Sequence, residues 1–463
     1  MNAENHRPTA AGRQGSMVGG PDSSRLQSRR AIAGAACGHV VEWYDFAIYG
    51  YLAIYIGKAF FPSEDPVVQL LSAFAIFGIS FFARPLGGIF LGPLADRHGR
   101  KRIMVLVVSI MSISTVLIGI VPTYQQIGLI APLLLVVLRL VQGFSAGGEV
   151  GNANAFAAEY SIDNRRGLGV SWMAFSSVAG IMLGGILATG LSTLLTSDSM
   201  ESWGWRIPFL LAAPLGIIGL YIRLKLEDTP KFVAESKSDE ARINPLRELL
   251  QYKRALFLTF GIATMYSVSF YMVFTYMNTY LRVVAHLPNG VTLVAALLAA
   301  ITALLVIPTT GYLSDRVGRK PVLLVSATLF LVLSYPIFSW ISGGTTVAAI
   351  VGTAILAAMQ GSFLATSMIT MTELFKVRVR VTGMSIGINI PAAIFGGMAP
   401  FAATYLIDVT GNSLSPTFYL IAAATVALVA LIVMNTSDLT TGSDERADID
   451  TRSDAPVRAR QGR

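Results

Sequence analysis

Two carboxylates lie inside an apolar segment near the start of the chain. Glu42 and Asp45 are three residues apart in segment 31–56, so they share one face of a helix, which Tyr49 continues. An ionised carboxylate in hydrocarbon costs at least about 2.5 kcal/mol, so it needs water, a cation or a bound proton. The pattern therefore predicts proton coupling or substrate contact. A structural ion pair is the alternative.

A second apolar segment, 131–154, carries a base and an acid. Arg139 lies about 12 Å into this segment, and Glu149 follows ten residues later. A guanidinium keeps its charge, so it cannot carry a proton, but it binds carboxylates bidentately and favours the ionised form of a neighbouring acid. We predict that both residues act in coupling or substrate binding. The alternative is that Arg139 pairs with Glu149, or with an acid of the first segment, and holds helices together.

Aromatic residues in the apolar segments could line a substrate cavity. Their faces attract quaternary ammonium groups through cation–π interactions, although each one taken alone is more often explained by plain packing. The cavity candidates are Trp43, Tyr44, Tyr49, Trp172, Tyr266, Tyr271 and Tyr276.

One charged stretch occurs twice, at 92–101 and 311–320, with seven identical residues of ten. Each copy lies between two apolar segments, so it predicts a short loop joining two membrane helices, within an internal duplication. Its acids can cap a helix or pair with a base and so hold one conformation, or they can serve folding alone. We assign this gating or structural role to Arg84, Gly92, Asp96, Arg97, Gly99, Arg100, Gly311, Asp315, Arg316, Gly318 and Arg319, placing Arg84 near the loop end of its segment.

The composition indicates a protein with many membrane spans. Of 463 residues, 53% are hydrophobic and 13% are charged, and the mean hydropathy is +0.60. Apolar stretches of about 20 residues predict twelve helices in two sets of six. They cover 31–56, 68–91, 103–121, 131–154, 167–195, 206–224, 254–281, 290–312, 321–341, 346–372, 382–408 and 416–435.

The polar segments divide the chain. We expect disordered tails at 1–30 and 436–463, six-helix bundles at 31–224 and 254–435, and a linker at 225–253. Lys and Arg concentrate in the tails and in the loops after even-numbered spans, so both termini are expected in the cytoplasm. The net charge of +8 follows from this topology, and nucleic-acid binding is not expected.

Signatures of enzymes and cofactor sites are absent from the sequence. It has no phosphate-binding Gly-Lys-Ser/Thr loop, its four histidines lack metal-ligand spacing, and Cys37 is the one cysteine. We therefore expect no enzyme activity, metal or cofactor, and transport driven by an ion gradient, with the proton as coupling ion.

The duplicated G-x-L-x-D-R-x-G-R-K stretch resembles the signature loop of the major facilitator superfamily of transporters. Further stretches, at 38–46, 84–88, 142–149 and 203–209, are similar to its metabolite:proton symporter branch. The resemblance implies an all-α fold of twelve helices in two pseudo-symmetric bundles in a bacterial inner membrane, functioning as a monomer with a small-molecule substrate.

Within that branch, residues 112–115, 158–161, 214–221 and 275–281 resemble the proline/glycine-betaine symporters. The resemblance implies import of a zwitterionic osmolyte with protons. Two departures leave an organic-acid/proton symporter as the alternative: Arg139 stands where the osmolyte symporter has Lys, and the tail 436–463 lacks heptads. A drug/proton antiporter is a weaker alternative, because antiporters of the superfamily typically carry a Gly-Pro motif in the fifth span and Gly180–Gly190 contains no proline. A membrane sensor without transport is also weaker, because the short tails leave no room for a signalling domain.

Overall fold

The computed structural model is almost entirely helical. It describes residues 21–98, 100–161, 164–225, 245–376 and 379–439, with side chains described from residue 31 and not at 96–100 or 245–246. Among these residues, eleven helical segments are long and apolar enough to cross a membrane. The remaining span is the first helix of the chain, α1 (Pro21–Tyr51). Its mean hydropathy is low because residues 21–30 are mostly polar and because His39, Glu42 and Asp45 interrupt its apolar residues. The predicted all-α fold is confirmed.

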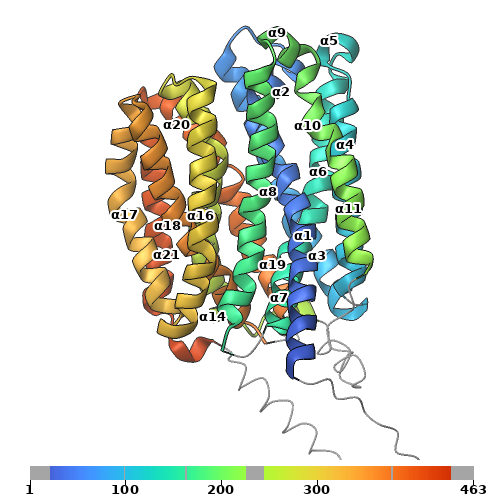
Figure 1. Ribbon diagram of the computed structural model, residues 1–463, viewed down its shortest axis with the longest axis vertical. Coiled ribbons are helices and arrows are strands. Elements are labelled where there is room, and N and C mark those ends of the chain that lie inside the picture. The colour runs from blue at the N-terminus through green and yellow to red at the C-terminus, as the bar shows by residue number, and fades with distance from the viewer. Residues whose placement is uncertain (1–20, 99, 162–163, 226–244, 377–378, 440–463) are drawn as a thin grey trace, which may run out of the picture.

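The first half of the chain supplies six spans. After α1, which α2 (Ala53–Phe60) continues, come α3 (Pro66–His98), α4 (Arg100–Ile120), α6 (Ile130–Ala146) with α7 (Glu149–Tyr160), α8 (Arg166–Leu194), and α10 (Arg206–Leu210) with α11 (Ala212–Leu224). Short helices α5 (Tyr124–Ile127) and α9 (Ser197–Ser199) lie in the connections at the upper end of the molecule (Figure 1).

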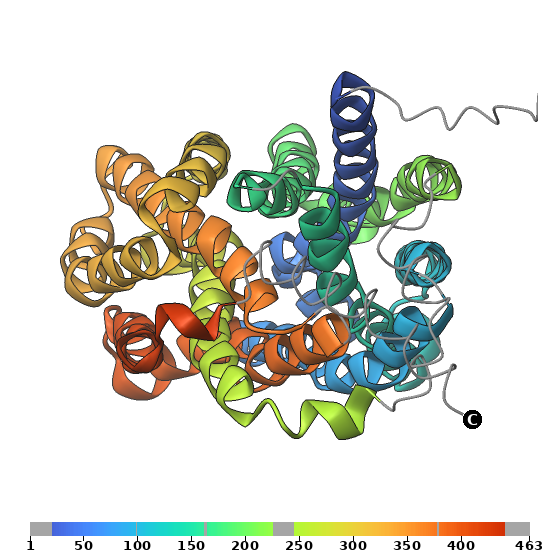
Figure 2. The same ribbon diagram turned by 90° about the horizontal axis from the view of Figure 1, so that it is seen from below.

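The second half repeats this plan. Its spans are α14 (Lys253–Tyr271) with α15 (Met277–Thr279), α16 (Asn289–Val317), α17 (Arg319–Ser342), α18 (Thr346–Glu373), α19 (Arg380–Pro391) with α20 (Ala399–Thr410), and α21 (Ser415–Val433). Helix α13 (Pro245–Leu249) precedes them. Seen from below, the two halves lie side by side (Figure 2).

The halves meet mainly where α8 packs on α16 and α3 packs on α19, and α8 with α18 and α7 with α19 add further contacts. Small residues allow the first pair to approach closely: a Cβ on Gly311 would come within 2.7 Å of Ser171 Cβ and 2.9 Å of the Gly167 carbonyl oxygen. In Figure 1, α8 and α16 stand next to each other at the centre of the molecule.

Two spans next to this interface are interrupted by π-helical turns. Residues Met272–Tyr276 follow α14, and Ala392–Gly396 follow α19. Such turns occur frequently at functional sites. Here the turn after α14 places Tyr276 against Phe74 of α3, at 6.3 Å between ring centroids.

Candidate functional site

Two guanidinium groups lie deep inside the molecule beside the same aromatic ring. Arg84 on α3 and Arg139 on α6 are 3% and 1% exposed. Their guanidinium carbons lie 4.3 Å and 5.4 Å from the centre of the Phe46 ring on α1. Two like charges so close to one another favour the binding of an anionic group between or beside them.

Arg139 is held by hydrogen bonds from its own half. Its Nη1 donates to Gln142 Oε1 at 3.0 Å and its Nη2 to Ser80 Oγ at 3.4 Å. Gln142 in turn donates to Thr115 Oγ1 at 2.6 Å, which fixes the amide. The ring of Tyr49 lies 4.2 Å from the Arg139 guanidinium carbon. These contacts fix the position of the Arg139 guanidinium in this conformation.

Arg84 has hydrogen-bond donors that are available to a ligand. It is buried in the interior, against Phe46 and, at 4.1 Å, Phe81. Its Nε and Nη2 have no hydrogen-bond partner among the described residues. Two buried donors without acceptors suit a carboxylate of a substrate.

Asp45 faces the same region. Its carboxylate is 1% exposed, and neither oxygen has a hydrogen-bond partner in the described part of the chain. Arg139 and Glu42 are the charged groups that act on it electrostatically. An unpaired buried carboxylate is costly unless it binds a proton or a cation.

Aromatic rings from both halves enclose this centre. Trp43 packs edge-on against Phe270 at 4.7 Å, and Tyr271 packs edge-on against Phe81 at 4.9 Å. Tyr49 stacks near Phe77 and donates to the Ala73 carbonyl. Tyr266 lines a small pocket with Trp43. These rings form a wall that could surround an ammonium group.

Two of the aromatic candidates lie elsewhere. Trp172 is 41% exposed on the outside of α8 and packs on Phe175, so it does not face a cavity. Tyr44 is buried within the first half, where its hydroxyl donates to the Pro208 carbonyl at 2.5 Å. The face of a helix that meets the cavity depends on its rotation, which hydropathy does not specify.

Glu149 is paired with a residue that the sequence analysis did not single out. Both of its oxygens accept hydrogen bonds from Arg223 of α11, and both side chains are fully buried. The alternative that Arg139 pairs with Glu149 is therefore wrong. Arg223 also donates to the Met104 carbonyl, which ties α11, α7 and α4 together.

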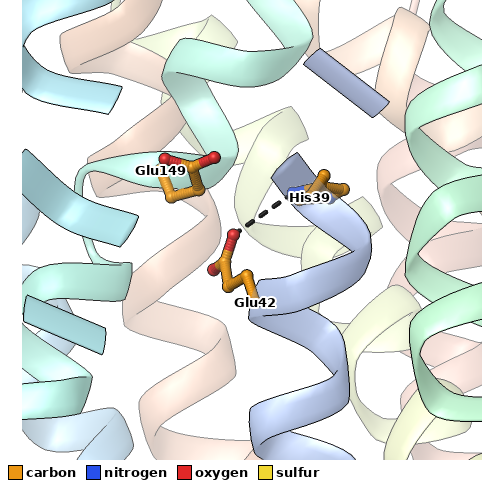
Figure 3. A group of neighbouring side chains, drawn as sticks. All are labelled: His39, Glu42 and Glu149. Carbon is orange, nitrogen blue, oxygen red and sulfur yellow. Dashed lines mark ion pairs between the residues drawn. The ribbon is translucent and has the colours of Figure 1, made fainter. Parts of the chain in front are cut away.

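His39 is a second buried residue of this region that was not predicted as a site residue from the sequence. Its Nδ1 lies 3.2 Å from Glu42 Oε2, one helical turn away, and Glu149 lies beside the pair (Figure 3). One nitrogen or oxygen atom from each of the three residues lies within 4.8 Å of the others, which is close enough for the three to be considered as ligands of a metal ion. The hydrogen bond that Trp43 Nε1 donates to His39 Nε2 opposes metal binding, since a neutral imidazole bound through Nδ1 would carry hydrogen on Nε2.

The second copy of the duplicated loop joins the two halves at the lower end of the molecule. Asp315 accepts hydrogen bonds from the backbone N–H of Gly167 and Leu168, at 2.8 and 2.9 Å. Arg319 pairs with Asp315 and with Glu373, at 2.8 and 3.1 Å.

The other loop residues have local contacts or fall outside the description. Arg316 covers the Tyr312 ring, and Gly318 has a φ of 92°, which favours glycine. Gly92 lies against Thr382 of the second half. Of the first copy, Gly99 and the side chains of Asp96, Arg97 and Arg100 lie outside the described residues.

Sequence comparison identifies the family. The family described as "Sugar (and other) transporter" matches residues 31–244, and "Major Facilitator Superfamily" matches residues 291–456. A proline/betaine transporter of Escherichia coli (strain K12) is 38% identical over 418 residues, which cover 88% of this chain and 83% of the relative. The chain belongs to the major facilitator superfamily of membrane transporters.

Other relatives support the same branch of the superfamily. A transporter from Dickeya dadantii (strain 3937), described as a glycine betaine/proline/ectoine/pipecolic acid transporter, is 38% identical over 425 residues, covering 89% of this chain and 84% of the relative. The predicted proline/betaine branch is therefore confirmed.

Solved structures support the superfamily fold. The proton:xylose symporter XylE superposes with a TM-score of 0.70 at 15% identity, over 92% of this chain and 99% of that chain. A partially occluded inward-open form of XylE from E. coli gives 0.68, also at 15% identity, over 89% and 99%. These likenesses concern the fold. The named relatives are transporters rather than enzymes, and this superfamily member is a multi-pass membrane protein with a small-molecule substrate.

Proposed function

We propose that this superfamily member imports a small zwitterionic osmolyte of the proline or glycine betaine type together with protons. The observation that carries the proposal is the identity of 38% over most of the chain to transporters named for these substrates. The proton is the coupling ion, and no metal or cofactor takes part. Both termini lie in the cytoplasm, in keeping with the distribution of Lys and Arg. The monomer is the working unit.

The buried centre has the chemistry that a zwitterion needs. The unpartnered Nε and Nη2 of Arg84 are suited to a substrate carboxylate. Trp43, Phe270 and Tyr271 present aromatic surfaces to the ammonium group. One anchor for each charge, at the interface of the halves, favours a site near the bilayer midplane.

Asp45 is the preferred proton acceptor, with Glu42 as the second. A proton taken from outside neutralises Asp45, and a neutral carboxyl no longer attracts Arg139. The loaded halves then rock inward, because the charge that opposed burial is gone. Approach of Arg139 or of water on the inside favours release of the proton.

An organic-acid/proton symporter is the second candidate. The observation that favours it is the presence of two buried guanidinium groups, Arg84 and Arg139, beside one ring. Such a pair would suit two carboxylates of citrate or 2-oxoglutarate.

Uptake into proteoliposomes distinguishes these candidates. Labelled proline, glycine betaine, citrate and 2-oxoglutarate are offered with and without an inward proton gradient. We expect gradient-dependent accumulation of the two zwitterions. Uptake of the acids alone would transfer the proposal to the second candidate, and accumulation without a proton gradient would contradict proton coupling.

A further inference from the structure

The Nε2 atom of His39 has a donor and an acceptor beside it at the same time. Trp43 Nε1 donates to this nitrogen at 2.9 Å. Ser177 Oγ lies 3.2 Å from it and donates its own hydrogen to the Met173 carbonyl at 3.0 Å. While its hydrogen points to Met173, the serine oxygen offers the imidazole a lone pair as acceptor.

These neighbours select different protonation states of the ring. In the neutral ring, Nε2 accepts from Trp43, so the hydrogen lies on Nδ1, the nitrogen 3.2 Å from Glu42 Oε2. When a proton from the aqueous phase binds Nε2, a new N–H bond forms there. The indole N–H then faces another donor, and its hydrogen bond breaks, while Ser177 Oγ accepts from the new N–H.

The indole that loses its partner touches the other half of the protein. Trp43 is 2% exposed. The centroid of its ring lies 4.7 Å from that of Phe270 and 6.4 Å from that of Tyr271, and both of these residues are on α14. Among the described residues, the ring of His39 packs on Trp43 and not on an aromatic ring of α14. A change at the imidazole therefore reaches the second half through Trp43.

We propose that His39 is a proton-operated switch between the two halves of the transporter. Protonation moves the Nε2 hydrogen bond from Trp43 to Ser177 and releases the indole from its fixed position against Phe270 and Tyr271. The proposal rests on the proposed function in one respect, because proton-coupled transport supplies the proton that operates the switch.

Charged groups face His39 from three helices. Glu42 faces it from α1, Glu149 from α7, and Arg223 from α11 is bound to Glu149. With both carboxylates ionised, these groups carry a net charge of minus one, which protonation of the imidazole neutralises. Helix α14 contributes the phenol of Tyr266. From α8 and α18, the described residues lining the adjacent pocket are uncharged: Met173, Ala174, Ser177 and Met368.

The adjacent pocket provides the place where the two halves meet the switch. Its lining includes His39, Trp43 and Ser177 from the first half. Tyr266 and Met368 line it from the second half. A small shift of the indole here changes its packing against the second half.

Tryptophan fluorescence tests the switch independently of transport. Trp172, Trp203 and Trp340 are 41%, 50% and 43% exposed and are replaced by Phe, while buried Trp205 is kept as a constant background. Emission of the protein in nanodiscs is then followed from pH 5 to pH 8, the range in which imidazoles titrate. We expect a pH-dependent change from Trp43 that disappears in His39→Gln, because the Gln carbonyl accepts from Trp43 at every pH.

Two further variants sharpen this test. Ser177→Ala removes the acceptor of the protonated ring, so the midpoint of the emission change moves to lower pH by about one unit. His286→Gln, at an exposed loop position, is the matched control and keeps the titration. A titration that survives in His39→Gln, or no titration in the parent protein, would overturn the switch.

Uptake by the same proteins separates this inference from the proposed function. Gradient-driven uptake of glycine betaine without a His39-dependent emission change overturns the switch alone. A His39-dependent emission change in a protein whose uptake ignores the proton gradient supports the switch and contradicts proton-coupled transport. With both intact, His39→Gln is expected to flatten the pH profile of uptake while counterflow exchange of label continues.

Discussion

Asp315 of the second half caps the first turn of α8 in the first half through the backbone N–H of Gly167, at 2.8 Å. A second bond reaches Leu168 at 2.9 Å. The carboxylate accepts hydrogen bonds from two N–H groups that have no partner inside the helix. Its negative charge is attracted to the positive end of the helix dipole. This contact holds the halves together at the lower end of the molecule.

Asp315→Asn should therefore favour separation of the halves at that end. Loss of the charge and of one acceptor costs about 0.5–2 kcal/mol, which changes a two-state population by roughly 2- to 30-fold. Spin-label distances between the lower ends of α8 and α16 measure this change. Asp408→Asn, an exposed carboxylate on α20, is the matched control and should leave the distances unaltered.

Removal of one member of the Glu149–Arg223 pair should be strongly destabilising. Both side chains are fully buried, so Glu149→Gln leaves Arg223 as an unbalanced buried charge and costs about 3–5 kcal/mol. Thermal unfolding in detergent measures the loss. Lys58→Gln breaks the exposed Lys58–Glu201 pair and should cost less than about 1 kcal/mol. Equal losses in the two variants would mean that the buried pair is not a structural element.

Gly143→Ala should separate α6 from α3. A Cβ at this position would overlap the carbonyl of Ser80, and a helix backbone cannot yield as a flexible side chain can. We expect a loss of about 1–3 kcal/mol. Gly190→Ala has open space and should be neutral or stabilising by up to about 1 kcal/mol. Comparison of the two melting temperatures checks the prediction, which fails if Gly143→Ala melts at or above the parent protein.

Asp45→Asn should abolish accumulation while sparing exchange. The amide mimics the protonated carboxyl, so the loaded halves can still move, but no proton is released and uphill transport stops. Gradient-driven uptake and counterflow of labelled substrate are measured on the same proteoliposomes. Unchanged gradient-driven uptake in this variant would remove Asp45 from the coupling mechanism.

Acid should release the short 3₁₀ turn Thr436–Asp438, which follows α21, from α14. Arg254 donates to both Asp438 oxygens, at 2.7 and 2.9 Å, and holds the pKa of that carboxyl below its usual value. A lowered pKa in the bound form means that the contact is present at neutral pH and is lost as the pH falls through that lowered value.

A spin label at Leu439→Cys, in a Cys37→Ser protein, measures the mobility of this turn. We expect an immobilised label above about pH 5 and a mobile one under stronger acid. Asp438→Asn should make the label mobile throughout this range. A label that remains immobilised in Asp438→Asn would show that other contacts hold the turn.

Much of the architecture follows from local features of the sequence. Apolar segments of about 20 residues gave the membrane helices, and the repeated loop gave the division into halves. Helix α1 was predicted as a span although its hydropathy is low, because its apolar residues continue on both sides of the acids. The duplicated loop also identified Asp315, since a short charged loop must lie at a helix end.

The partners of the buried charges were decided by tertiary structure. Hydropathy and spacing place Arg84, Glu149 and Trp172 on helices, but not the direction in which each helix is turned. Rotation and crossing of the helices brought Arg84 against Phe46, paired Glu149 with Arg223 from 74 residues away, and left Trp172 on the outside. The contact of His39 with Ser177 depends on the crossing of α1 and α8 in the same way, whereas its contact with Trp43 lies within α1, four residues along the same helix. Sequence alone thus determined which segments cross the membrane, while packing determined which charges meet, because a buried charge takes whichever partner the neighbouring helix presents.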